Sequence, residues 1–189
     1  MNRANAVTQL KQTWTILSAD IDAAVEYGRL NNTPYAQRAL VRAFFAAVEG
    51  LSYQMRQVTL ASLAGTECLT EAEVHLLREV RYSLDQNGRP KQAPTFLQFP
   101  ESLLFSISMY AKNHGAVFEI DTSLAGWQAL RQITHIRNNV THPKAPESLT
   151  LSDDNLKTLL NASQWWHETL LKLFTACDEA DEELRAKLG

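Results

Sequence analysis

The sequence contains few of the residues that build disulfide frameworks, zinc sites or membrane spans. Its two cysteines are Cys68 and Cys177, and neither a CxxC pair nor a Cys/His zinc spacing occurs. No apolar run approaches the roughly 20 residues that cross a bilayer, and residues 1–14 lack the apolar core of a signal peptide. We therefore expect a cytoplasmic protein that needs no metal or cofactor and makes no contact with a membrane.

An excess of positive charge is also missing. The chain has 18 Lys and Arg against 21 Asp and Glu, which gives a net charge of -3. This balance argues against a protein that coats nucleic acid nonspecifically, although it leaves room for a local basic site. The 45% hydrophobic and 21% charged content is typical of a soluble globular protein. The length of 189 residues suits one domain, residues 1–189.

Apolar residues recur at steps of three and four in most of the chain, which indicates helices. The first helix is predicted over residues 5–30, and the second begins at Pro34 with Thr33 as its cap. Thr70 and Glu73 form a capping box for a shorter third helix. These starts depend on local capping chemistry and therefore can be placed from the sequence.

The remaining segments alternate between an irregular region and further helices. Residues 83–99 contain an Asn-Gly pair and two prolines, so they predict a loop with room for a small hairpin. A fourth helix follows over roughly 100–113, ending near a glycine. Residues 117–123 predict a short extended piece whose Thr122 or Ser123 caps the next helix.

The last helix has the clearest pattern. Ser152 precedes two aspartates, a favourable cap and first turn, and an apolar heptad-like rhythm continues to Leu184. With no internal repeat, the sequence predicts an all-α fold: an up-and-down bundle of about five helices with one irregular loop over 83–99.

One stretch, "ITHIRNNVTHPK" at residues 133–144, places unusual side chains at a helix end. At 100° per residue, Arg137 lies on the apolar side of its helix, between Leu130 and Ile133. A guanidinium is seldom buried without a partner, because stranding its charge costs free energy. We therefore expect Arg137 to meet a carboxylate, a phosphate or a cleft.

The histidine of this stretch stands just before a proline. Pro143 disfavours helical geometry at His142, so the helix should end at 139–141 and release the imidazole from its axis. The imidazole can then turn toward Arg137, with Asn138 beside it.

Cations gather around this helix end. No acid occurs between positions 121 and 147, whereas Arg131, Arg137 and Lys144 lie in that interval. Arg131 and Lys144 are therefore candidates for contact with a phosphate chain.

A second group of arginines lies on the predicted second helix. Arg38, Arg42, Glu49 and Arg56 fall within about 40° of one another around the axis, and Glu49 is the only acid among them. We expect Glu49 to pair with Arg137, and Arg42 and Arg56 to face RNA phosphates.

The chemistry that fits these residues is RNA cleavage without a metal. RNA supplies its own nucleophile, the 2′-OH; a histidine can move a proton near neutral pH, and an arginine can stabilise the scissile phosphate. One histidine cannot easily serve on both sides of the phosphorus, so we expect a homodimer with the site at its interface. Two purely structural alternatives remain open. Arg137 forms only a structural ion pair with Glu49, and His142 is only an exposed residue whose charge suits the helix end.

The segment also resembles a known family. "RNNVTH" resembles the R-x4-H signature of HEPN domains (higher eukaryotes and prokaryotes nucleotide-binding), all-α domains of which many are metal-independent endoribonucleases. The wider stretches "FEIDTSLAGWQALRQITHIRNNVTHPK", "LTLSDD" and "RAFFAAVEGLSYQMR" are similar to bacterial HEPN-like proteins. The resemblance implies a dimer with facing motifs, catalytic Arg137 and His142, and a supporting Asn138. Glu49 is a weaker correspondence.

The family also implies a biological setting. Such proteins often belong to toxin–antitoxin or phage-defence systems, so an antitoxin or regulatory protein is an expected partner beside RNA. Some HEPN toxins are inactivated by modification of a tyrosine two places after the histidine, and Lys144 occupies that place here. Two functions stay in view: a HEPN-type endoribonuclease, and a catalytically silent helical dimer that binds RNA, nucleotide or a protein partner.

Overall fold

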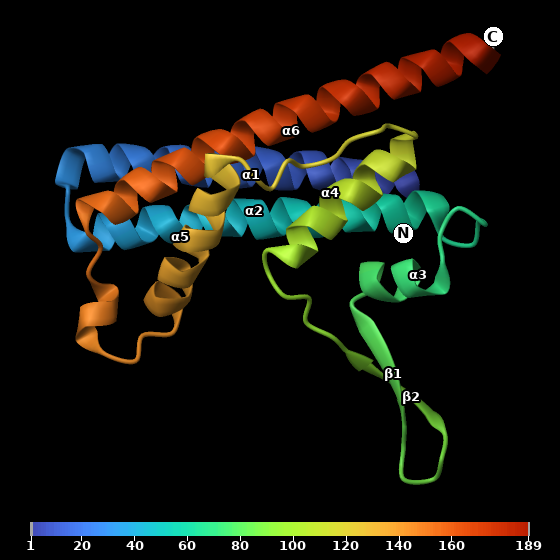
Figure 1. Ribbon diagram of the computed structural model, residues 1–189, viewed down its shortest axis with the longest axis horizontal. Helices are drawn as coiled ribbons and strands as arrows, with labels where there is room; N and C mark the ends of the chain where they lie inside the picture. The colour runs from blue at the N-terminus through green and yellow to red at the C-terminus, as the bar shows by residue number, and fades with distance from the viewer. Residues whose placement is uncertain (1, 189) are drawn as a thin grey trace.

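The structure is a computed structural model that describes residues 2–188, and it is dominated by helices (Figure 1). In chain order the elements are α1 (Arg3–Asn31), α2 (Pro34–Leu63), α3 (Glu71–Leu77), β1 (Val80–Leu84), β2 (Pro90–Pro94), α4 (Glu101–His114), α5 (Ala125–Thr141), the 3₁₀ helix η1 (Pro146–Leu149) and α6 (Asp153–Leu188). The predicted all-α bundle is confirmed. Of the six α-helices in this part of the chain, five are long and α3 has only seven residues.

The helices form one body around the antiparallel pair α1 and α2 (Figure 1). Helix α4 packs on α2, helix α5 packs on α6, and α6 crosses the bundle along its length. The main core joins buried side chains from all five long helices, including Leu10, Val48, Leu103, Leu130 and Leu170. No described helix is both long enough and apolar enough to cross a bilayer.

Three of the predicted side-chain caps are confirmed, at the starts of α2, α3 and α6. The Thr33 hydroxyl accepts the N–H of Ala36 at 3.2 Å, and Thr70 forms the expected capping box with Glu73. The Ser152 hydroxyl accepts the N–H of Asn155 at 3.2 Å. Each of these contacts spans three residues, so tertiary structure has little opportunity to override it.

The start of α5 is different from the prediction. Its cap is Leu124, and no side chain accepts a hydrogen bond there, so the prediction of a Thr122 or Ser123 cap is wrong. The carboxylate of Asp121 accepts both the N–H and the hydroxyl of Ser123, at 2.8 and 2.5 Å. This local turn occupies the hydroxyl that would otherwise cap the helix.

The irregular region contains the small hairpin that its turn residues allowed. Strands β1 and β2 pair antiparallel from Val80↔Pro94 to Leu84↔Pro90, so the hairpin begins three residues before the predicted loop. The turn is closed by Asp85, whose carboxylate accepts the N–H groups of Asn87 and Arg89, both at 2.8 Å. Gly88 takes a φ of 72°, which glycine adopts without strain. Figure 1 shows the hairpin standing out from the helices.

Helices α5 and α6 approach closely at one glycine. A Cβ added at Gly126 would lie 2.6 Å from Cδ1 of Trp165 and still closer to its Cβ and Cγ. The indole of Trp165 also contacts that of Trp127, with ring centroids 5.5 Å apart. The absence of a side chain at Gly126 therefore lets this tryptophan pair fill the α5–α6 contact.

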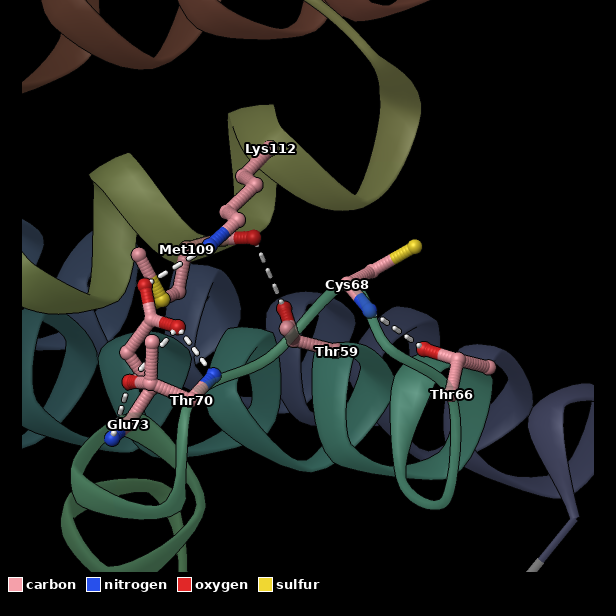
Figure 2. A network of polar contacts seen from close by, with 7 residues as sticks. All are labelled: Thr59, Thr66, Cys68, Thr70, Glu73, Met109 and Lys112. Atoms are coloured by element: carbon pink, nitrogen blue, oxygen red, sulfur yellow. Dashed lines mark hydrogen bonds and ion pairs between the residues drawn. The ribbon is translucent and has the colours of Figure 1, made fainter.

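A polar network joins α2, α3 and α4 (Figure 2). The Glu73 carboxylate accepts the N–H of Thr70 at 2.7 Å and pairs with Nζ of Lys112 at 2.7 Å, which lowers its pKa. The Thr59 hydroxyl donates to the carbonyl of Met109 at 3.2 Å, so α4 is also bonded directly to α2.

The two cysteines differ in reactivity as a result of their positions. Cys68 is exposed, and Figure 2 shows its thiol pointing away from the polar network, whereas Cys177 is buried and burial raises its pKa to about 12. Only the thiolate reacts with disulfide reagents. We expect one thiol to react with DTNB in the native protein at mildly alkaline pH and the second only after unfolding. Cys68→Ser should abolish the native signal; two rapidly reacting thiols would contradict this assignment.

Candidate functional site

A hollow lies between α2, α5 and the segment that leads from β2 into α4. It has a volume of about 620 Å³ and a largely polar lining. Its walls are Glu49, Ser52, Tyr53, Arg56, Glu79, Leu97, Gln98, Phe99, Ser102, Thr134, Arg137 and Asn138. We call this hollow the arginine cleft, because two guanidinium groups line it.

Arg137 contributes one of these groups and is held on two sides. Its Nη2 donates to the Glu49 carboxylate on α2, which confirms the predicted pairing. The guanidinium also stacks over the Phe45 ring at 5.0 Å from the centroid. The Arg137 side chain is 20% exposed, and its Nε is buried without a hydrogen-bond partner. The guanidinium is therefore fixed in orientation at the edge of the cleft.

Arg56 contributes the second group from deeper in the bundle. It is only 5% exposed, donating to the Ser106 hydroxyl at 2.7 Å and to the Glu79 carboxylate at 2.5 Å. Burial lowers the pKa of Arg56, and the neighbouring Glu79 charge opposes that effect. We expected Arg56 to face RNA phosphates, but the structure places it as a buried link between α2, α4 and the base of the hairpin.

The other arginines of the predicted stripe bind backbone carbonyls. Arg42 donates to the carbonyl of Val140 at 3.2 Å, and Arg38 donates to that of Leu149 at 3.0 Å. Both acceptors belong to the region around the C-terminal end of α5. Arg42 therefore uses one N–H donor to bind the backbone at the end of α5, while the residue stays accessible to solvent.

Two of the predicted motif residues line the cleft and the third does not. Asn138 is an exposed residue of its wall, next to Arg137. His142 is the C-cap of α5, with a non-helical φ of -127° and ψ of 64°, so the helix ends at Thr141 as Pro143 predicted. The His142 side chain is exposed and lies outside the cleft lining, and within residues 2–188 it forms no hydrogen bond to Arg137. Arg131 and Lys144 are exposed as well.

No sequence pattern predicted the opposite wall of the cleft. Glu79, Gln98 and Ser102 line it, and Glu79 adopts a φ of 54° between α3 and β1. A positive φ is uncommon for a residue other than glycine. The ion pair between the Glu79 carboxylate and Arg56 offsets the cost of this backbone conformation. The one available signal was the acid directly before the β-branched strand residue Val80, and that signal has no specific meaning alone.

The cleft has donors for an anion but no cluster for a metal. Among the described residues, no three His, Cys, Asp or Glu side chains gather closely enough to hold a metal ion. Comparisons with known proteins found no matching family model, no matching curated protein and no matching solved structure.

Proposed function

We propose that the protein is a metal-independent endoribonuclease of HEPN type, acting as a homodimer. The observation that carries the proposal is the placement of Arg137: Glu49 and Phe45 fix its guanidinium at the edge of a polar cleft. The same helix ends five residues later in an exposed imidazole, His142. An oriented cation and a free general acid–base at one helix end suit phosphodiester cleavage.

The chemistry follows from the groups available. A neutral His142 takes the proton of the RNA 2′-OH, and the 2′-oxygen attacks the adjacent phosphorus while the P–O5′ bond breaks. The leaving 5′-oxygen receives a proton from the imidazolium of the second copy. Arg137 stabilises the charge that develops on the non-bridging oxygens. The products are a 2′,3′-cyclic phosphate and a 5′-hydroxyl.

The wider setting belongs to the same proposal. A nuclease of this class that acts inside a cell needs control, so a toxin or phage-defence effector held by an antitoxin or regulatory protein is the corresponding role. Exposed Arg131, Lys144 and Arg42 would hold RNA phosphates around the helix end. The cell compartment consistent with this role is the cytoplasm.

A second function is favoured by two specific features. Glu49 already neutralises Arg137, and His142 stands outside the arginine cleft. Both features suit a catalytically silent helical dimer that binds RNA, nucleotide or a protein partner. In that case RNA would be retained without being cut.

The deciding experiment is incubation of the purified full chain with total tRNA and with an unstructured RNA in excess EDTA. We expect cleavage in EDTA, because no metal takes part in the proposed mechanism, and 2′,3′-cyclic phosphate ends, because the 2′-oxygen attacks the adjacent phosphorus. An oligonucleotide with 2′-deoxyribose at the mapped cleavage position should resist, because it lacks the nucleophile. Sedimentation of the same sample should give a dimer. Retention of RNA without cleavage would support the silent alternative, and cleavage of the 2′-deoxy substrate would contradict the proposed mechanism.

A further inference from the structure

We propose that the β1–β2 hairpin is an arm that binds single-stranded RNA beside the arginine cleft. The arm comprises residues 78–96, from the end of α3 to the exposed Phe96 after β2. The choice of RNA as ligand rests on the proposed function, whereas the arm itself is argued from its geometry, charge and exposed rings.

The arm is joined to the cleft at both of its ends. Glu79 at its base and Leu97 just beyond it both line the arginine cleft. The Thr95 N–H donates to the carbonyl of Glu79 at 2.8 Å, which closes the base of the hairpin. Figure 1 shows that the rest of the hairpin projects away from the helices. A strand of RNA that passes the cleft would therefore meet the arm next.

The arm is basic although the chain as a whole is acidic. Arg81, Arg89 and Lys91 are exposed, and none forms an ion pair with a carboxylate in residues 2–188. Both acids of the arm have partners: Glu79 pairs with Arg56, and Asp85 accepts N–H groups of its own turn. With the exposed Arg78 at the base, four cations without an ion pair in residues 2–188 thus lie on the arm, as a phosphate-binding surface requires.

The strand alternation separates charge from apolar surface. Arg81 pairs across the ladder with Ala93, and Ser83 pairs with Lys91, so the two cations share one face. Tyr82 and Leu84 lie on the other face and are 51% and 71% exposed.

The arm also carries an aromatic side chain that is almost fully exposed. Phe96 is 94% exposed, between β2 and the cleft-lining Leu97. Exposed rings and exposed cations on one hairpin supply the two contacts that single strands use, stacking on the bases and charge for the phosphates, because each unpaired base offers a flat face. A duplex would hide those faces, so the arm suits single strands.

The β2 edge of the hairpin is poorly suited to binding a peptide by strand addition. Strand β2 has proline at both ends, Pro90 and Pro94, and proline has no N–H to donate to an added strand. Main-chain hydrogen bonds give such complexes their affinity. We therefore assign RNA binding to the exposed side chains of the arm.

The test measures RNA binding in a His142→Ala background, in which cutting does not interfere. Fluorescence anisotropy with a labelled short oligouridylate, in EDTA and at several salt concentrations, compares this chain with one that also carries Arg81→Gln, Arg89→Gln and Lys91→Gln. We expect roughly tenfold weaker binding at low salt, and a slope of log K against log salt that is less steep by about 2. The control carries Lys11→Gln, Lys172→Gln and Lys187→Gln, an equal charge change on α1 and α6, and should bind like the parent. Equal losses in both variants would overturn the proposal.

The rings are tested separately in the same assay. Tyr82→Ala with Phe96→Ala should weaken oligouridylate binding by roughly tenfold and leave the salt slope unchanged, because stacking releases no counterions. Circular dichroism should show that each variant keeps its helical content. Equal affinity for a duplex RNA, insensitive to the ring substitutions, would overturn the assignment to single strands.

The two proposals can fail independently. Cleavage that depends on His142, together with arm variants that bind RNA normally, removes the arm and retains the nuclease. Binding that depends on the arm, without cleavage by the wild-type chain, removes the nuclease and retains the arm.

Discussion

Replacing His142 by alanine is expected to lower the rate of RNA cleavage by roughly 10²–10⁴-fold, because it removes the imidazole that carries both proton transfers in the proposed mechanism. The side chain is exposed at the end of α5, and its backbone N–H, which bonds the Asn138 carbonyl at 2.8 Å, is retained in the variant. Folding should therefore be unaffected. Single-turnover cleavage of a labelled RNA in EDTA, followed on a denaturing gel, measures the effect.

The control for this result lies on the same helix. His135 is also exposed, about two turns earlier on α5, and His135→Ala removes an imidazole from the same region. It should cleave at the wild-type rate. If both variants cleave like wild type, the activity belongs to another site or to a contaminant, and His142 has no catalytic role.

Arg137 gives the complementary part of the same prediction. Arg137→Lys keeps the charge but loses the planar fork that holds Glu49 while leaving donors for a phosphate. We expect roughly 10²–10³-fold slower cleavage in Arg137→Lys, in line with the loss of an oxyanion donor. A lysine variant with full activity would reduce Arg137 to the structural ion pair that the sequence also allowed.

The second large effect is on stability. Arg56→Ala is expected to lower the free energy of unfolding by about 3 kcal/mol, because it leaves a cavity and removes a buried guanidinium from its partners. The estimate is at the low end for a broken buried pair, since the Glu79 side chain is 35% exposed and water can solvate it. For a chain of this size the melting temperature should fall by roughly 6–12 °C. Urea unfolding followed by circular dichroism measures the change.

An exposed arginine provides the matched comparison. Arg29 pairs with Glu26 on α1 at 2.9 Å, but its side chain is 69% exposed. Arg29→Ala should leave the unfolding free energy nearly unchanged, since solvent screens the pair. Equal losses at Arg29 and Arg56 would mean that the buried link to the hairpin contributes nothing of its own.

The sequence predicted the features that depend on near neighbours. The caps at Thr33, Thr70 and Ser152 each use a donor three residues away, and Pro143 ends α5 through its direct effect on the preceding residue. The pairing of Glu49 with Arg137 was also accessible, because Glu49 is the only acid on its helix stripe.

The rest depends on how distant segments meet. Arg56 and Glu79 are 23 residues apart, and their contact exists because Glu79 turns the chain at a positive φ. Helical periodicity placed Arg56 beside Arg42 on one stripe but could not show that Ser106 of α4 closes over it. The far wall of the cleft, at Gln98 and Ser102, comes from a segment whose path no local rule fixes.

Because the hairpin is attached to the helices at its base, its length can be changed by protein engineering. The Glu79–Arg56 ion pair and the Thr95–Glu79 hydrogen bond lie at its base, whereas Asp85 in the turn is hydrogen-bonded to Asn87, Gly88 and Arg89 of the same hairpin. Two extra residues in each strand would move the tip outward by about 7 Å without altering the bundle. A series of such lengthened hairpins would serve as a molecular ruler for the proposed RNA-binding arm, reporting how far its contacts lie from the proposed cleavage site.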